Sequence, residues 1–134
     1  FVRDLLRNAI DTSPEAAVGR VLRDGEHVPG FGHSVYTGPD PRAPVLLEAV
    51  ERAKPPRDVW NAAQGVMAVM ARDTGPHPNI DFALGVFAEA TRMVDGAGET
   101  IFAVARSAGW IAHGLEEYQH RLRYRIRATY TGPD

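Results

Sequence analysis

A histidine lies in a stretch of the sequence that is rich in glycine and proline. This stretch, "VPGFGHSVYTGPDPRA", spans residues 28–43 and contains His33. Glycine and proline are poor residues for the interior of helices and strands, so the stretch predicts a structured loop. A histidine held in such a loop can polarise a carbonyl oxygen or hold an anionic group, because a preorganised donor loses little energy to reorganisation.

A carboxylate lies further along, in the segment "HPNIDFALG". This segment predicts a helix that begins near Pro78 or Asn79 and carries Asp81 in its first turn. The helix dipole favours a negative charge at this end, so one interpretation is a carboxylate that only stabilises the helix start. The other is a general base whose pKa is tuned by burial against Ile80 and Phe82. The distance between this carboxylate and the loop histidine decides between them.

An arginine interrupts the apolar segment "ETIFAVARSAGWIAHGLEE", which covers residues 99–117. We expect Arg106 to be partly buried on this helix and therefore to need an anion, for which a carboxylate is the bidentate match. The alternative is that the arginine extends across the core and pairs with an acidic residue at the surface. His113 follows seven residues later on the same face and is expected to be a core histidine.

Composition excludes several kinds of function. The chain of 134 residues has no cysteine, which excludes disulfides, thiolate catalysis and a cysteine-ligated zinc site. A formal net charge of −2 argues against nucleic acid and anionic membranes as partners. No second histidine or carboxylate follows His33 at a ligand spacing such as i+4, so we expect no metal. We expect a soluble, cytoplasmic protein, since no apolar run approaches the roughly 20 residues that cross a bilayer.

The elements that position these residues are all predicted to be helices, because apolar residues recur at three- and four-residue spacing and nowhere alternate as in a strand. Ser13 and Pro14 are typical of a helix start, and "KPP" at 54–56 separates two helices. The first ten residues enter a helical pattern midway without an initiator Met, so we expect a C-terminal piece of a longer protein. The six expected helices cover residues 1–10, 13–25, 42–53, 57–75, 80–93 and 98 to about 122.

Four motifs occur in one order along the chain: "PGFGHSVYTGPDPRA", "HPNIDFALG", "FAVARSAGWIAHGLEE" and "RYRIRATYTG". In this order they resemble the C-terminal part of the citrate synthases and 2-methylcitrate synthases, over nearly the whole chain from about Asp11. The resemblance implies an all-α fold and a homodimer whose subunits have a large and a small domain. Residues 1–92 would form the small, CoA-side domain, incomplete at its N-terminus. Residues 93–134 would be the final helix and tail of the large domain.

The resemblance also implies a reaction. Asp81 would remove a proton from the methyl group of acetyl-CoA, or from propionyl-CoA, and His33 would polarise the ketone of oxaloacetate toward attack. The products would be citrate, or 2-methylcitrate, and CoA, with the acyl-CoA as a substrate and no tightly bound cofactor. Arg42, Arg106 and Arg125 would hold the carboxylates of oxaloacetate, Arg125 from the other subunit. The residues that the resemblance assigns to CoA are Val28, Pro29, Gly30, Phe31, Gly32 and Asn79.

The sequence departs from the family pattern at several positions. Ser34 and Thr37 stand where many bacterial members have basic residues, and Ile126 replaces a proline, which leaves Arg123 and Arg127 as alternatives to Arg125. The glycine-rich "HGGA"-type segment that carries the family's other catalytic histidine does not occur in these residues. We therefore expect the isolated chain to be inactive. The alternatives to a piece of a complete enzyme are a small subunit of a split synthase and a helical interaction module that has lost its chemistry.

Overall fold

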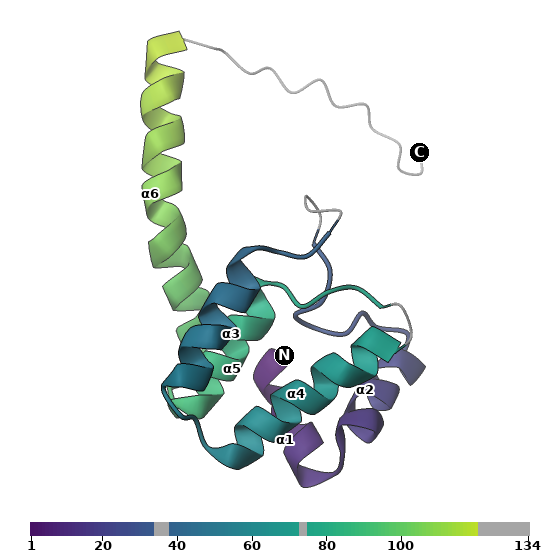
Figure 1. Cartoon of the computed structure of the whole chain (residues 1–134). Helices are drawn as coiled ribbons and strands as arrows, with labels where there is room; N and C mark the ends of the chain where they lie inside the picture. Colours follow the sequence, from purple (N-terminus) through teal and green to yellow (C-terminus); the bar gives the residue numbers. More distant parts are fainter. Residues whose placement is uncertain (34–37, 73–74, 121–134) are drawn as a thin grey trace, which may run out of the picture. The chain divides into compact units, whose positions relative to one another are not determined.

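The computed structural model describes residues 1–33, 38–72 and 75–120, and in these ranges the chain is helical without any strand (Figure 1). For these described ranges, the prediction of an all-α fold with six helices is confirmed. Two compact units are distinct, Phe1–Gly98 and Glu99–Asp134, and each is described by itself. The helices are α1 (Val2–Asp11), α2 (Pro14–Arg23), α3 (Arg42–Arg52), α4 (Arg57–Arg72), α5 (Ile80–Ala90) and α6 (Ala97–His120).

Local signals in the sequence set the helix ends. The Ser13 hydroxyl accepts a hydrogen bond from the Ala16 N–H at 3.1 Å, and Pro14 follows at the first helical position, as predicted. At the C-terminal end of α5, Arg92 adopts a left-handed conformation with φ of 52°. The Arg92 N–H then bonds to the Glu89 carbonyl and the Met93 N–H to the Ala88 carbonyl, which stops the helix in a Schellman motif.

Helix α5 is the central element of the first unit and packs against α1, α3 and α4. Its buried residues lie on every side of the helix, so it is apolar all round rather than amphipathic. Phe82 and Val86 are completely buried in the shared core, together with Leu6 of α1 and Val66 of α4. Only the first turn of α5 brings an acidic side chain to the surface, and this residue is Asp81.

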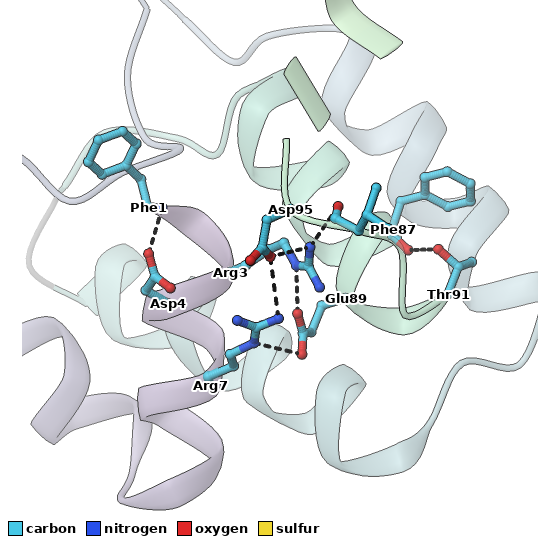
Figure 2. A network of polar contacts seen from close by, with 9 residues as sticks. Phe1, Arg3, Asp4, Arg7, Phe87, Glu89, Thr91 and Asp95 are labelled. Atoms are coloured by element: carbon cyan, nitrogen blue, oxygen red, sulfur yellow. Dashed lines mark hydrogen bonds and ion pairs between the residues drawn. The ribbon is translucent and has the colours of Figure 1, made fainter. Parts of the chain in front are cut away.

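A polar network joins α1 to the far end of α5 (Figure 2). Glu89 accepts a hydrogen bond from Arg3 Nε at 2.8 Å and another from Arg7 Nε at 3.1 Å. Burial raises the pKa of Glu89, but the hydrogen bonds from the two arginines outweigh it and leave the pKa below its usual value. Arg3 also donates to the Val94 carbonyl and to Asp95, at 3.1 Å and 3.0 Å. The network therefore fixes the segment that follows α5.

Helix α6 belongs to the second unit from Glu99 onward, and none of its described side chains is classed as buried. Arg106 and His113 are both exposed, so the expected partial burial of the arginine and the expected core position of the histidine are wrong for this structure. An apolar helical pattern needs another segment to cover it, and the described residues of the second unit, taken by itself, consist of α6 alone. The large apolar side chains left exposed are Phe102, Val104, Trp110, Ile111, Leu115 and Tyr118.

Gly65 marks a close approach between α4 and α2 and supplies a test of the packing. A Cβ atom on Gly65 would lie 3.0 Å from Pro14 Cβ and closer still to Pro14 Cγ. Because the proline ring is rigid, Gly65→Ala should lower the free energy of unfolding by about 1–3 kcal/mol in urea titrations. Gly19→Ala is the control, because a Cβ atom there would meet only the end of the Arg23 side chain, at 3.3 Å. This substitution should stabilise α2 by about 0.5–1 kcal/mol. A Gly65 variant as stable as the parent chain would contradict this packing.

Candidate functional site

The loop that precedes His33 is joined to the segment just before α5. The Gly32 N–H donates to the His77 carbonyl and the Asn79 N–H donates to the Gly30 carbonyl, both at 2.9 Å. Between these bonds, Phe31 and Pro78 form an isolated antiparallel bridge. The predicted structured loop is confirmed for residues 28–33, and residues 34–37, with Ser34 and Thr37, lie outside the described part of the chain.

Glycine is required where this loop lies on α5. Gly30 has a φ of 84°, and a Cβ atom there would lie 2.7 Å from Phe82 Cβ and 2.8 Å from Phe82 Cα. The adjacent Phe31 ring packs on the Phe82 ring, with 4.9 Å between centroids and a tilt of 57°. Val28 is buried in the core. The loop therefore has one side fixed to the helix, and its proposed contact with CoA stays a prediction.

The first backbone N–H groups of α5 all have acceptors. The Asn79 side-chain oxygen accepts from the N–H groups of Asp81 and Phe82, at 2.9 Å and 3.2 Å. The Asp40 carboxylate accepts from the Ile80 N–H at 2.9 Å, and the Ala83 N–H bonds to the Asn79 carbonyl at 3.3 Å. A helix start with unpaired N–H groups is a ready anion site. In α5 these groups are already used, so an anion near Asp81 would have to be held by side chains.

Asp40 is a residue of this site that the sequence reasoning missed. The residue is only 2 % exposed. One carboxylate oxygen accepts from Arg42 Nε at 2.9 Å and from the Arg42 N–H at 3.0 Å, and the other accepts from Arg42 Nη2 at 2.8 Å. The hydrogen bonds from the Arg42 side chain hold the pKa of Asp40 well below its usual range, against the effect of burial. The signal in the sequence was an aspartate two residues before an arginine that begins a helix.

Arg42 also contacts the loop histidine. Arg42 Nη2 lies 3.2 Å from His33 Nε2, and the His33 side chain is exposed. A guanidinium only donates hydrogen bonds, so Nε2 is the acceptor in this contact and a neutral ring then carries its proton on Nδ1. Asp40 thus fixes Arg42, and Arg42 fixes one edge of the imidazole. Two residues predicted for the same substrate therefore lie side by side.

Asp81 lies where the sequence predicted it, in the first turn of a helix, and α5 begins at Ile80, within one residue of the expected Asn79. The expected burial of its carboxylate against Ile80 and Phe82 is wrong, because Asp81 is exposed. Successive residues of a helix are about 100° apart around its axis, so Phe82 can enter the core while Asp81 faces outward.

The other arginines predicted to bind substrate lie either in the second unit or outside the described residues. Arg106 is in the second unit, and its position relative to His33 is not described. Arg125, with the alternatives Arg123 and Arg127 and the neighbouring Ile126, lies outside the described residues. The structure thus brings together His33, Arg42 and the loop that is joined to the start of α5.

The described residues contain neither a membrane-spanning helix nor a cluster of metal-ligating side chains. None of the helices in residues 1–33, 38–72 and 75–120 combines the length and the apolar character that crossing a membrane requires. Over the same residues, histidines and acidic side chains nowhere gather in threes as a metal site would need.

Sequence comparison with known proteins finds the same family that the four motifs resemble. Residues 2–128 match the family model described as the C-terminal domain of citrate synthase. A citrate synthase of Haloferax volcanii is 36 % identical over 126 residues, which is 91 % of this chain and 33 % of the relative. Citrate synthase 2 of Bacillus subtilis is 34 % identical over 116 residues, 84 % of this chain and 31 % of the relative. The chain thus spans about a third of the length of these curated relatives.

A solved structure agrees on the fold. The crystal structure of citrate synthase from Thermotoga maritima matches 98 % of this chain and 39 % of its own, with a TM-score of 0.81 and 24 % identity. The helical architecture and the matched motifs define a C-terminal domain from a family of enzymes. The chain belongs to the citrate synthase family. The resemblance found in the sequence is confirmed.

The charge on Asp40 gives a pH-dependent test. Its lowered pKa adds stability that is present above 3.8, the ordinary value for an unfolded aspartate, and is lost as the pH falls below it. In urea titrations at pH 7, the free energy of unfolding of the parent chain should be about 2 kcal/mol higher than that of Asp40→Asn. This difference should shrink by about 1 kcal/mol at pH 3, since one pKa unit is worth about 1.4 kcal/mol.

Asp58→Asn is the matched control, because Asp58 is exposed in the first turn of α4 and its loss should change stability by no more than about 1 kcal/mol. A difference between the parent chain and Asp40→Asn that is equal at pH 7 and pH 3 would contradict the assigned role of the Asp40 charge.

Proposed function

We propose that the natural polypeptide containing this chain is a citrate synthase-type acyltransferase that condenses acetyl-CoA, or propionyl-CoA, with oxaloacetate. The products are citrate, or 2-methylcitrate, and CoA. Family membership supports the class of reaction. The observation that carries the proposal is the contact of Arg42 with His33, beside a loop that is bonded to the start of the helix bearing Asp81.

The proposed chemistry uses two side chains of the first unit. The Asp81 carboxylate takes a proton from the carbon next to the thioester carbonyl, and the resulting enol attacks the ketone carbon of oxaloacetate. His33 donates a hydrogen bond to the ketone oxygen and transfers to it the proton that makes it a hydroxyl group as the carbon–carbon bond forms. Solvent returns a proton to His33, and Asp81 releases to solvent the proton that it took. Hydrolysis of the thioester then releases CoA. The exposure of Asp81 and His33 supports these roles, since both groups must reach a substrate that enters from solvent.

Arginines supply the recognition of oxaloacetate in this proposal. Arg42 orients one carboxylate, and Arg106 and Arg125 bind the others, Arg125 in the site of a second subunit of a homodimer. The fork of a guanidinium matches a carboxylate in two parallel hydrogen bonds, so it fixes the direction of the ketone as well as the charge. The choice between acetyl-CoA and propionyl-CoA is left open, because one methylene is worth only about 1–3 kcal/mol.

The isolated chain is proposed to be inactive and the natural polypeptide to act in the cytoplasm. The chain has no glycine-rich histidine segment of the kind that stabilises the enol oxygen in the family. His33 and Asp81 supply the ketone donor and the base, which leaves this third role without a residue. The missing histidine would come from the part of the protein that is not included in these residues.

The first test is CoA release from acetyl-CoA and oxaloacetate by the natural polypeptide and its Asp81→Asn variant. The amide cannot accept the proton, so kcat should fall by about 10²- to 10⁴-fold. Oxaloacetate binding, measured by calorimetry, should stay close to that of the parent, and Asp58→Asn serves as the control for loss of an exposed helix-starting carboxylate. Turnover near that of the parent would remove Asp81 from the role of base.

A second test concerns the arginine of α6. Arg106→Leu in the natural polypeptide should raise the dissociation constant of oxaloacetate by about 10- to 100-fold, because a pair of charge-assisted hydrogen bonds is lost. Arg72→Leu is the control, since Arg72 is an exposed arginine at the end of α4 with no proposed contact to substrate. An unchanged dissociation constant for the Arg106 variant would leave Arg106 without a role in binding.

A further inference from the structure

The side chain of Asn79 uses both ends of its amide. Its Nδ2 group donates to the Gly32 carbonyl at 2.7 Å. Its Oδ1 atom accepts from the N–H groups of Asp81 and Phe82. Gly32 is bonded covalently to His33, so one amide and its hydrogen bonds connect the backbone before the histidine to the backbone of the aspartate.

We propose that Asn79 is a positioning residue that fixes His33 and Asp81 relative to each other. It acts through the Gly32 carbonyl and the first turn of α5, and it need not touch substrate. The inference rests on the proposed function for its catalytic consequence. The connection itself is a property of the described residues and can be tested without any turnover.

Capping alone does not account for the identity of this residue. Serine, threonine and aspartate cap helices about as well as asparagine does, because only an acceptor oxygen is needed. None of them has a second group that donates from the far end of a side chain of this length. The additional bond to Gly32 is therefore the feature that only asparagine supplies here, and it joins the loop to the helix.

The bond between Asn79 and the Gly32 carbonyl is one of two connections that hold His33 near the start of α5. On the other edge of His33, Arg42 contacts the ring and is itself held by buried Asp40. Asp40 in turn accepts from the Ile80 N–H, next to Asp81. The histidine is thus connected to the start of α5 by two routes, one through its backbone and one through its ring. A displacement of about 1 Å between reacting groups can cost about 100-fold in rate.

The test separates capping from positioning with Asn79→Asp. This variant keeps the acceptor for Asp81 and Phe82, removes the donor and places a carboxylate oxygen against the Gly32 carbonyl. In the natural polypeptide we expect kcat to fall by about 10- to 100-fold. The dissociation constant of oxaloacetate should change by less than about threefold, because the arginines that hold it are untouched. The midpoint of thermal unfolding should stay within a few degrees of the parent.

Two further variants serve as controls. In Asn79→Ser the serine side chain also caps the helix but is too short to reach the Gly32 carbonyl. This variant should therefore lower kcat without introducing electrostatic repulsion at the loop. Asn61→Asp makes the same chemical change at an exposed position of α4 and should leave kcat as it is. If Asn79→Asp turns over within about twofold of the parent, Asn79 is only a helix cap and the proposal is overturned. The proposal is also overturned if the loss of kcat disappears at temperatures equally far below each midpoint.

A measurement on the chain itself keeps the inference separate from the proposed reaction. Hydrogen exchange of the Gly32 N–H, which bonds to the His77 carbonyl, should become about tenfold faster in Asn79→Asp. Exchange of the Ala83 N–H in α5 should stay unchanged, since the helix start is still capped. Equal exchange at Gly32 in both proteins overturns the connection. Failure of the natural polypeptide to release CoA refutes the proposed function and leaves this exchange result to decide the connection.

Discussion

The arrangement of the first unit depends on how the backbone N–H groups at the start of α5 are satisfied. An aspartate in a loop and the asparagine at the helix cap supply the acceptors, and each has a second partner elsewhere. Asp40 also holds Arg42, and Asn79 also holds the loop before His33. Because a buried donor without an acceptor costs about 1–3 kcal/mol, the helix start, the loop and the start of α3 can hardly move independently. The chemistry of the site therefore follows from the need to satisfy one helix end.

The body of α5 makes that end a stable reference. Helix α5 is buried on all sides, so rotation or translation would expose or overpack apolar side chains such as Phe82 and Val86. At its other end, Glu89 is bound by two arginines of α1 and the chain leaves through a Schellman motif. Both ends of the helix are thus fixed by polar contacts and its middle by packing. An exposed carboxylate in the first turn gains a defined position without being buried itself.

Periodicity and capping signals were enough to predict the six helices, and Ser13 and Asn79 lie at helix starts as the pattern indicated. Burial was not predictable in the same way. Asp81 was expected to be buried by its neighbours in sequence, but neighbours in sequence lie on different sides of a helix. Arg106 and His113 were expected to be covered, and the sequence does not say which segment covers α6. Asp40 was missed because its second partner, Ile80, is 40 residues away. Local patterns predict elements, while burial and long-range partners depend on how the elements meet.

The charges of the first unit explain why the proposed reaction needs more of the protein than this unit. Arg42 is paired with Asp40, whose lowered pKa keeps it ionised at neutral pH, so the pair carries no net charge. Asp81 adds a negative charge if it is to act as a base. In the proposed site, the charge of Arg42 is thus balanced by Asp40, so Arg42 can orient a carboxylate of a dianion such as oxaloacetate without neutralising it. The proposed neutralising charges, Arg106 and Arg125, come from later in the sequence. If the proposed roles of these arginines hold, the substrate would contact residues that are far apart in the sequence, and the proposed reaction would depend on bringing them together.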